Sequence, residues 1–459
     1  MSTAEHGGVA AARALQDAGI EALFALPGGH VLPLFEGARV LGLRLIDTRH
    51  EENAVFMAEG WALATGRPAA AAVTAGPGLA NALPGMAEAN AAGVPVVVIA
   101  GRTGVGQRNR GAVQDLDQLT AVMPVTKWRA ECLDPARVAW FVEEAVHMAR
   151  SGAPGVAYLE VPQDVFAGVA STEERPWPAG HDSPGRSRPV AGDVDRAVAV
   201  LSEAERPVIV AGSGAFFSGA GDALRAFVER TGIPVTTTSA ARGLVDDDHD
   251  LCLGGLVHGG IALASADAAL VLGSRFNANL VYGGLPLFPP GQRIVQVDVR
   301  PEHLGGLRKP DVGLVGDVAA TLEALTEAWT GSPDASAEWV AQARQGAALS
   351  WQQWDEQCER PANGLHPGWL AREVARFAEE HGPGTFVSDG GDSVLWGIAL
   401  SKAHRPGTNL LIGSAMGTLG IGLPFAAAAK AARPDEPAFV FTGDGAFGLS
   451  AVELDTAAR

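Results

Sequence analysis

Short apolar runs that end at glycine recur along the first part of the chain, and longer alanine-rich segments follow them. Residues 21–28, 69–76 and 94–101 are runs of this kind. Strands that are apolar throughout are typical of sheets buried on both faces, which are parallel sheets covered by helices. The alternation therefore predicts repeated strand–helix–strand units and a doubly wound α/β fold.

Two polar stretches divide the chain. Residues 171–190 are rich in Pro, Ser, Gly and charged residues, and a second stretch lies near 330–366. Such compositions are typical of linkers. They predict three doubly wound parallel-sheet domains, at 1–170, 190–328 and 366–459.

The third predicted domain is short. Its strands are expected within 385–391 and 438–445, and residues 449–459 end inside a predicted helix. A sheet of so few strands would leave apolar faces uncovered. We therefore expect this domain to be truncated at its C-terminus and the sequence to be part of a longer protein.

Charge and composition narrow the class of protein. The 34 basic and 52 acidic residues give a net charge of −18, which repels a phosphate backbone, so no nucleic-acid partner is expected. The three cysteines lack CxxC spacing and predict neither a disulfide framework nor a zinc site. The N-terminus does not resemble a signal peptide, and no apolar run is long enough to span a bilayer. We expect a cytoplasmic protein without a membrane partner.

Asp444 is the first candidate for binding chemistry. It lies between Gly443 and Gly445, directly after an apolar strand, and Ala446 continues into a predicted helix. Open α/β sheets bind ligands at the carboxyl ends of their strands, and glycines let backbone N–H groups approach an anion. A carboxylate there suits Mg²⁺, which prefers carboxylate and phosphate oxygens. An ordinary Asp-Gly turn is the alternative.

Glu51 follows the strand at 43–47 and opens a helix. A surface acid in the first helical turn is the usual outcome for such a residue, whereas a functional role requires that Glu51 be buried. The strand at 69–73 likewise leads into Gly76-Pro77-Gly78 and a helix that contains Asn81. This is either a loop that approaches a ligand or a tight turn.

A third glycine-rich segment begins at Gly413 and contains Gly417 and Leu419. Such a loop allows the backbone to approach a flat ligand closely while one bulky apolar side chain is held against it. A flexible hairpin is the alternative.

Together these motifs resemble the thiamine-diphosphate-dependent enzymes of the acetolactate synthase, oxalyl-CoA decarboxylase and 2-hydroxyacyl-CoA lyase family. The resemblance covers essentially the whole chain. Each motif is weak alone, but their common order is specific. In that order they are Pro27-Gly28-Gly29, Glu51, Gly76-Pro77-Gly78, Gly417-Thr418-Leu419-Gly420 and Gly443-Asp444-Gly445.

The resemblance implies a role for each motif. Glu51 would hydrogen-bond the aminopyrimidine ring of thiamine diphosphate and favour its imino tautomer, and Leu419 would support the bent cofactor. Asp444 would be the first Mg²⁺ ligand, and the remaining ligands would lie beyond Arg459. The family also implies a homodimer or homotetramer with the active site at the subunit interface.

Gln114 bears on the type of reaction. Simple 2-oxoacid decarboxylases of the family carry a His-His pair in the corresponding loop, but residues 108–122 contain no histidine. Gln114 instead matches the loop of acetolactate synthases and of their acyl-CoA-using relatives. A loop amide that bonds only to backbone is the alternative.

The C-terminal tail favours the acyl-CoA group. Residues 446–459 resemble the run after the metal motif in 2-hydroxyacyl-CoA lyases, whereas residues 110–118, 124–128 and 422–435 resemble acetolactate synthases. The sequence therefore favours a lyase that cleaves 2-hydroxyacyl-CoA to formyl-CoA and a ketone or aldehyde. Acetolactate synthase and a catalytically silent binding or regulatory subunit are the alternatives.

In the central segment, charged residues are expected at three strand ends. They are Arg275, Asp298 and Asp317. Strand-end acids suit a ribose or adenine and an arginine suits a diphosphate, so the resemblance implies ADP or FAD, with ADP preferred beside acyl-CoA chemistry. Ordinary loop charges are the alternative.

Overall fold

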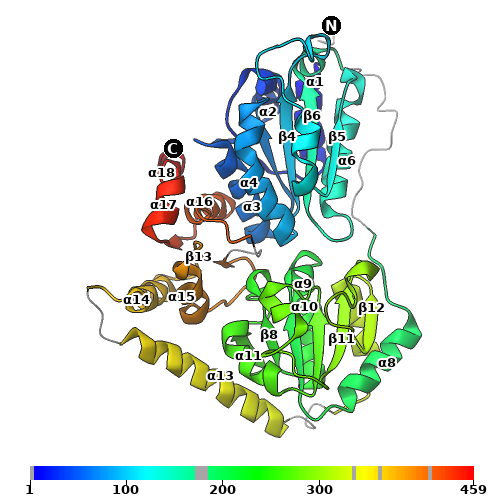
Figure 1. Cartoon of the computed structure of the whole chain (residues 1–459), viewed down its shortest axis with the longest axis vertical. Coiled ribbons are helices and arrows are strands. Elements are labelled where there is room, and N and C mark those ends of the chain that lie inside the picture. The colour runs from blue at the N-terminus through cyan, green and yellow to red at the C-terminus, as the bar shows by residue number, and fades with distance from the viewer. Residues whose placement is uncertain (1–4, 171–184, 333–336, 360–363, 412–415) are drawn as a thin grey trace. The chain divides into compact units, whose positions relative to one another are not determined.

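The computed structural model describes residues 5–170, 185–332, 337–359, 364–411 and 416–459 (Figure 1). Most of the predicted linker at 171–190, parts of the stretch at 330–366, and Gly413 lie outside the described residues. Among the residues described, the strands form three sheets in which neighbouring strands are all parallel, so the predicted fold class is confirmed.

The first sheet has the strand order β2-β1-β3-β4-β6-β5. Its strands are β1 Ala22–Ala25, β2 Arg44–Asp47, β3 Ala69–Val73, β4 Val96–Arg102, β5 Trp128–Glu131 and β6 Val156–Pro162. The helices of this part of the chain are α1 Gly7–Asp17, α2 Leu32–Leu41, α3 Glu51–Thr65, α4 Pro77–Ala92, α5 Gln118–Ala121, α6 Val138–Arg150 and α7 Gln163–Ala167. All five residues of β3 are buried, as the apolar run at 69–76 predicted.

Helices cover both faces of this sheet. One set of strand residues, which includes Leu23, Val97 and Leu159, packs in a single core cluster with residues of α1, α2 and α6. Helices α3 and α4 contact the sheet as well. Helix α3 is itself enclosed, because every residue from Asn53 to Ala64 is buried.

The second sheet has the order β12-β11-β10-β7-β8-β9. Its strands are β7 Pro207–Ala211, β8 Val235–Thr237, β9 Cys252–Gly255, β10 Ala268–Leu272, β11 Arg293–Asp298 and β12 Val312–Val315. Its helices are α8 Ala191–Ser202, α9 Ser213–Phe217, α10 Gly221–Thr231, α11 Leu256–Ser265, α12 Val318–Ala328 and α13 Ala337–Cys358.

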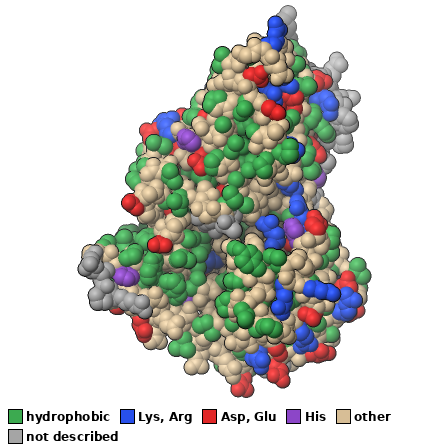
Figure 2. All heavy atoms as spheres, in the orientation of Figure 1, with side chains coloured by type: hydrophobic (Ala, Val, Ile, Leu, Met, Phe, Trp, Pro, Cys, Tyr) green, Lys and Arg blue, Asp and Glu red, His purple; other side chains and the backbone are tan. Residues whose placement is uncertain are grey.

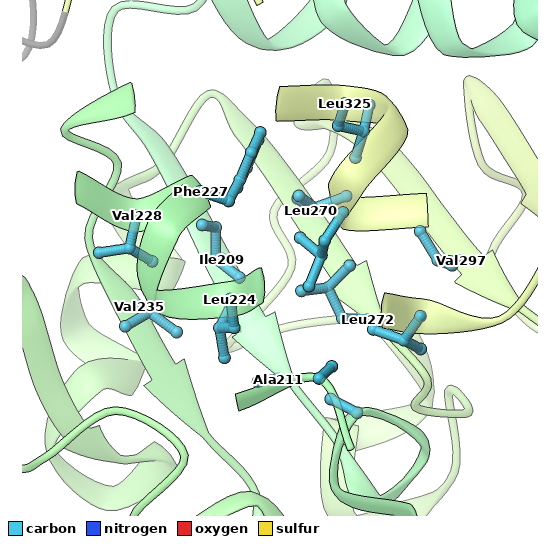
Figure 3. Packing of buried hydrophobic residues seen from close by; sticks show 14 of the residues in the cluster. Ile209, Ala211, Leu224, Phe227, Val228, Val235, Leu270, Leu272, Val297 and Leu325 are labelled. Carbon is cyan, nitrogen blue, oxygen red and sulfur yellow. The ribbon is translucent and has the colours of Figure 1, made fainter. Parts of the chain in front are cut away.

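Alternate residues of the central strands face opposite layers of helices. Figure 3 shows Ile209 and Leu270 packed with Phe227 of α10 and Leu325 of α12. The intervening residue Val210 belongs to a second cluster, with residues of α11 and α13. Each fully buried Val, Leu or Ile side chain contributes about 1.5–3 kcal/mol, which accounts for the apolar runs that made these strands predictable.

The third sheet has the order β14-β13-β15. Its strands are β13 Thr385–Ser388, β14 Asn409–Leu410 and β15 Ala438–Phe441. The helices of this part of the chain are α14 Pro367–Glu380, α15 Asp392–Leu400, α16 Gly422–Ala432, α17 Asp444–Ser450 and α18 Glu453–Ala458. Phe386 and Phe441 pack on residues of α14 and α15.

The chain forms two compact units. The first comprises Met1–Pro184, Met416–Ala432 and Gly445–Arg459, and the second comprises Gly185–Ala415 and Arg433–Asp444. Residues of the third predicted segment, 366–459, are thus divided between the units. Helix α16 joins the first unit because it packs on α3, where Gly60 leaves room for Phe425: a Cβ atom on Gly60 would lie 2.8 Å from the Phe425 Cα.

Lys and Arg side chains are intermixed with Asp and Glu side chains over the face seen in Figure 2. In the part of the chain that the structure describes, no helix has both the length and the apolar character needed to cross a bilayer.

Glu59 of α3 is an acidic side chain inside this packing. It is completely buried, and neither carboxyl oxygen has a hydrogen-bond partner among the described residues. Burial raises the pKa of Glu59 well above its usual range, and the neighbouring Glu88 of α4 raises it further. The folded chain therefore holds a proton on Glu59 that the unfolded chain releases above about pH 4.5.

This proton makes stability depend on pH. Since the folded state binds more protons, the free energy of unfolding falls as the pH rises from about 4.5 through the raised pKa. Glu59→Gln removes this loss. We predict that its thermal midpoint exceeds that of the wild type at pH 8 and that the difference shrinks towards pH 5. Glu323→Gln, an exposed change on α12, is the control and should show no such gap. An equal gap at both pH values would contradict the assignment.

Candidate functional site

Three turns meet at one edge of the first sheet. Strands β1, β3 and β4 are neighbours in the order β2-β1-β3-β4 and run parallel. The turns after them begin near Pro27, Thr74 and Thr103. Because the carboxyl ends of parallel strands share an edge, this is where an open α/β sheet binds a ligand.

The turn after β1 and the start of α4 both pack closely on Thr74. A Cβ atom on Gly28 would lie 2.3 Å from the Thr74 Cβ, and one on Gly78 would lie 2.7 Å from the Thr74 Cγ2. The Thr74 hydroxyl also lies 3.3 Å from Nδ1 of His30. Only glycine permits so close an approach at positions 28 and 78.

Glu51 lies beside the same turn. It is the first residue of α3 and is buried, with 8% of its surface exposed. Asn81 of α4 donates a hydrogen bond from Nδ2 to Oε2 of Glu51 at 3.0 Å, and Oε1 lies 3.3 Å from the Cβ position of Gly78. The burial that a functional role requires is therefore present, and the predicted residues Glu51, Gly78 and Asn81 lie together.

Gln114 comes to this edge from the loop that follows β4. Its backbone is in the left-handed region, at φ 62°, and packs on Gly76, whose φ is 60°. A Cβ atom on Gly76 would lie 2.8 Å from the carbonyl oxygen of Gln114. The Gln114 side chain is half-buried and hydrogen-bonds to His30. Gln114 is thus more than a loop amide that bonds only to backbone.

A buried polar network supports the Gly76 turn, and sequence reasoning did not find it. Gln118 accepts a hydrogen bond from the Gly76 N–H at 2.8 Å and donates to the Tyr158 hydroxyl at 3.0 Å. Glu160 accepts from Gln118, Tyr158 and Arg102. Burial raises the pKa of Tyr158 well above its usual range, with a further contribution from Glu160. No local motif in the sequence distinguishes Gln118 from a solvent-exposed glutamine.

The loop at Gly417 and Leu419 belongs to the first unit. The Thr418 hydroxyl donates to Oε2 of Glu88 on α4 at 2.9 Å, so this loop lies against the helix that carries Asn81. Leu419 is 37% exposed, and a side chain on Gly417 would meet nothing within 4 Å. The bulky apolar side chain and the open backbone beside it are both present, as the motif predicted.

Asp444 belongs to the second unit, at the carboxyl edge of the third sheet. It is exposed and begins α17, and Ala446 behind it is buried. A side chain on Gly445 would meet nothing within 4 Å, and one on Gly443 would meet only the Ser393 hydroxyl, at 3.9 Å. The backbone beside Asp444 is therefore open to an approaching group.

A buried acid on the neighbouring strand stabilises this turn. Asp389, at the end of β13, is 1% exposed and accepts hydrogen bonds from the Gly390 N–H at 2.7 Å and the Thr442 hydroxyl at 3.1 Å. The second bond ties the ends of β13 and β15 together. Asp389 is a site-supporting residue that the sequence motifs did not single out.

The three charged residues of the second sheet follow adjacent strands, as predicted. Arg275 follows β10 and is exposed. Asp298 ends β11 and accepts from the Arg300 N–H at 2.9 Å and contacts the His303 ring at 3.3 Å. Asp317 accepts from the Ala320 N–H at 3.1 Å and so caps α12. Both acids stabilise their own turns, and Arg275 is the exposed member of the three.

Asp246, Asp248 and His404 are the one group among the described residues with the spacing of metal ligands. Lys402 already pairs with Asp248 at 2.7 Å, and His404 with Asp246 at 2.9 Å. These ion pairs already engage the side chains of the cluster.

The architecture and its glycine-rich turns define a multidomain α/β protein of the type that binds ligands at the carboxyl edges of parallel sheets. Comparison with known families makes this specific. The N-terminal TPP binding domain of thiamine pyrophosphate enzymes matches residues 5–121, the central domain matches 194–325, and the C-terminal TPP binding domain matches 389–459. The chain belongs to the thiamine pyrophosphate enzymes, as its motifs predicted.

Individual relatives span nearly the whole chain. A probable acetolactate synthase of Mycobacterium bovis is 36% identical over 456 residues, which are 99% of this chain and 81% of the relative. The acetolactate synthase large subunit of Corynebacterium glutamicum is 33% identical over 465 residues, 98% of this chain and 72% of that protein. A 2-hydroxyacyl-CoA lyase of Arabidopsis thaliana is 32% identical over 466 residues, 99% and 80% of the two chains.

A second buried acid connects α18 to the start of α3. Glu453 is 1% exposed and accepts hydrogen bonds from the Arg49 N–H at 3.0 Å and from Nδ2 of Asn53 at 2.9 Å. These donors lie two residues before and two residues after Glu51. Glu453 therefore fixes the turn from which Glu51 projects, while Asp455 of the same helix pairs with the Arg49 side chain at the surface.

This arrangement predicts unequal effects for two neighbouring acids. Glu453→Gln replaces a charged acceptor of buried donors and should lower stability by about 1–3 kcal/mol. Asp455→Asn removes an exposed ion pair, which solvent screens, and should change stability little. Chemical denaturation of both variants measures the difference. If Asp455→Asn were as destabilising as Glu453→Gln, the role given to Glu453 would be wrong.

Proposed function

We propose that this chain is a thiamine-diphosphate- and Mg²⁺-dependent enzyme that joins 2-oxo acids, as in acetolactate synthesis. The observation that carries the proposal is Glu51, a buried carboxyl group held by Asn81 beside the Gly76–Gly78 turn. A buried carboxyl group is exceptional unless it has a partner or a task.

The residues of the first unit fit the pyrimidine end of the cofactor. When bound, thiamine diphosphate supplies the carbanion that attacks or leaves a carbonyl carbon. Glu51 holds a proton at a ring nitrogen through its carboxyl group, and the Asn81 amide orients that group. Pro27, Gly28 and Gly76 supply backbone without side-chain bulk near the ring, and Leu419 and Gly417 supply an apolar support and an open backbone.

The residues around Asp444 fit a metal and a diphosphate. The Asp444 carboxylate is a hard oxygen donor of the kind that Mg²⁺ prefers. The open backbone at Gly443 and Gly445, with the first turn of α17 at Ala446, suits an anionic group beside the metal. Within the family a cofactor held by both kinds of domain joins two subunits, so we propose a homodimer or homotetramer.

The second sheet is proposed to hold a nucleotide. Arg275, Asp298 and Asp317 lie at the carboxyl ends of three adjacent strands. The exposed guanidinium of Arg275 suits a diphosphate, so FAD or ADP is the proposed ligand. FAD would accompany acetolactate chemistry and ADP would accompany acyl-CoA chemistry.

The proposed reaction differs from the one that the sequence alone favoured, which was the cleavage of 2-hydroxyacyl-CoA. The C-terminal tail favours a 2-hydroxyacyl-CoA lyase, which remains the second candidate. Among the relatives above, however, two acetolactate synthases are 36% and 33% identical and the 2-hydroxyacyl-CoA lyase is 32% identical. Gln114 and its loop fit both groups, so the difference has to be decided by products.

Product analysis separates the candidates. We predict that the chain, supplied with thiamine diphosphate and Mg²⁺, converts pyruvate to acetolactate and CO₂. If the chain instead forms formyl-CoA from a 2-hydroxyacyl-CoA substrate and no acetolactate, the proposed acetolactate synthesis is wrong and the lyase activity takes its place. If neither product forms, a catalytically silent binding or regulatory subunit is favoured.

The isosteric variant Glu51→Gln tests the catalytic role of Glu51. The amide keeps the volume and a hydrogen bond to Asn81 but does not exchange the proton. We expect the variant to keep its thermal midpoint and to lose turnover by at least about 100-fold. Full turnover in Glu51→Gln would remove the proton-holding role of this residue. Asn81→Asp tests the orienting role separately, because it replaces the amide donor by a like charge.

A further inference from the structure

One histidine lies at the edge where the predicted residues meet, and no motif singled it out. His30 follows the Pro27–Gly29 turn, within the short 3-10 helix Gly29–Val31. Its Nδ1 is 3.3 Å from the Thr74 hydroxyl, and its ring also hydrogen-bonds the Gln114 side chain. The loop at 108–122 lacks a histidine, but the fold brings an imidazole to that loop from another strand end.

The position of His30 is fixed by its backbone. A Cβ atom on Gly101, in β4, would lie 2.4 Å from the His30 Cβ and 2.9 Å from its carbonyl carbon. The residue is thus pressed against the end of β4. The ring itself is held by Thr74, in the turn after β3, and by Gln114, in the loop after β4. Three separate segments orient this imidazole, which is the preorganisation that an acid–base group needs.

Thr74 lies between His30 and Glu51. His30 contacts the Thr74 hydroxyl, whereas Gly78, which adjoins Glu51, contacts the Thr74 methyl group. Glu51 is occupied by Asn81 and is buried, but His30 is only half-buried. This edge of the sheet therefore carries two titratable side chains, Glu51 and His30, of which His30 is the more accessible to an incoming molecule.

We propose that His30 exchanges a proton with the carbonyl oxygen of the substrate at this site. The inference builds on the proposed function, because it assigns the proton that C–C bond formation requires. When a bond forms to the carbonyl carbon, the π electrons move to oxygen, and that oxygen takes the N–H proton of the imidazolium. In the reverse direction the neutral ring removes the hydroxyl proton as the C–C bond breaks. Solvent restores the ring in each case.

The surroundings of the ring suit this role. The side chains that hydrogen-bond the ring, those of Thr74 and Gln114, are uncharged. Burial lowers the pKa of His30 from its ordinary value of 6.5, and the hydrogen bond to Gln114 opposes that shift. A ring that titrates below neutral pH is able both to give and to take a proton under working conditions.

Kinetics of His30→Asn test the proposal. The asparagine amide keeps a hydrogen bond to Thr74 but does not titrate. We expect kcat for acetolactate formation to fall by about 100-fold, with little change in KM for pyruvate. In the wild type the protonated ring acts, so the rate falls as the pH rises through its pKa. That limb of the profile should vanish in His30→Asn. A purely structural histidine predicts the opposite, namely wild-type kcat and an unchanged profile.

Two further variants and a stability measurement distinguish a catalytic effect from misfolding. His30→Ala removes the hydrogen bond as well and should be no less impaired than His30→Asn. His381→Ala, an exposed change at the end of α14, should leave kcat and the profile unchanged. Equal thermal midpoints for His30→Asn and the wild type show that the fold is retained.

Ring NMR provides a readout that does not need turnover. The chain has 11 histidines, and the His30 signal is the one missing from His30→Asn. We expect it to titrate below pH 6.5 in the full chain without ligands, and to shift when pyruvate is added to the complex with thiamine diphosphate and Mg²⁺. A His30 signal that ignores pyruvate would overturn the proposal, even if acetolactate forms. If no product forms but the signal responds, the proposed reaction fails and the substrate-facing role of His30 stands.

Discussion

The candidate site depends on one steric constraint, the close packing of glycines against Thr74 and Gln114. Gly28 and Gly78 lie so near this side chain that any Cβ atom would overlap it. Gly76 and Gln114 meet with similar closeness, both in the left-handed backbone region. Because these turns leave neighbouring parallel strands, the sheet brings them to one edge, and the glycines let them converge there. A side chain at either Thr74-contacting glycine would separate Glu51, His30 and Gln114.

Buried polar groups hold that edge in place. Gln118 bonds the Gly76 N–H and links it to Tyr158 and Glu160, while Glu453 binds the backbone before Glu51. Desolvation of such groups is unfavourable unless their hydrogen bonds are made. The satisfied network therefore stabilises one arrangement of the turns. Glu59 differs from these groups, since its buried carboxyl group has no hydrogen-bond partner among the described residues and remains protonated.

Sequence patterns predicted what depends on local composition. The all-buried strand β3, the parallel sheets and the start of α3 at Glu51 follow from apolar runs and from turn chemistry. Sequence patterns did not reveal partners that are distant in the chain. Glu453 meets a residue 404 positions away, and His30 meets Thr74 across 44 positions. The joining of α16 to α3 through Gly60 and Phe425 was equally invisible, because a helical glycine has no distinctive pattern.

The central claim is that the edge around Thr74 binds the pyrimidine of thiamine diphosphate through Glu51. A crystal structure of the chain with thiamine diphosphate and Mg²⁺ tests it most directly. We predict a Glu51 carboxyl oxygen within hydrogen-bond distance of a pyrimidine nitrogen, with the metal at Asp444. A cofactor bound with its pyrimidine away from Glu51 would contradict it.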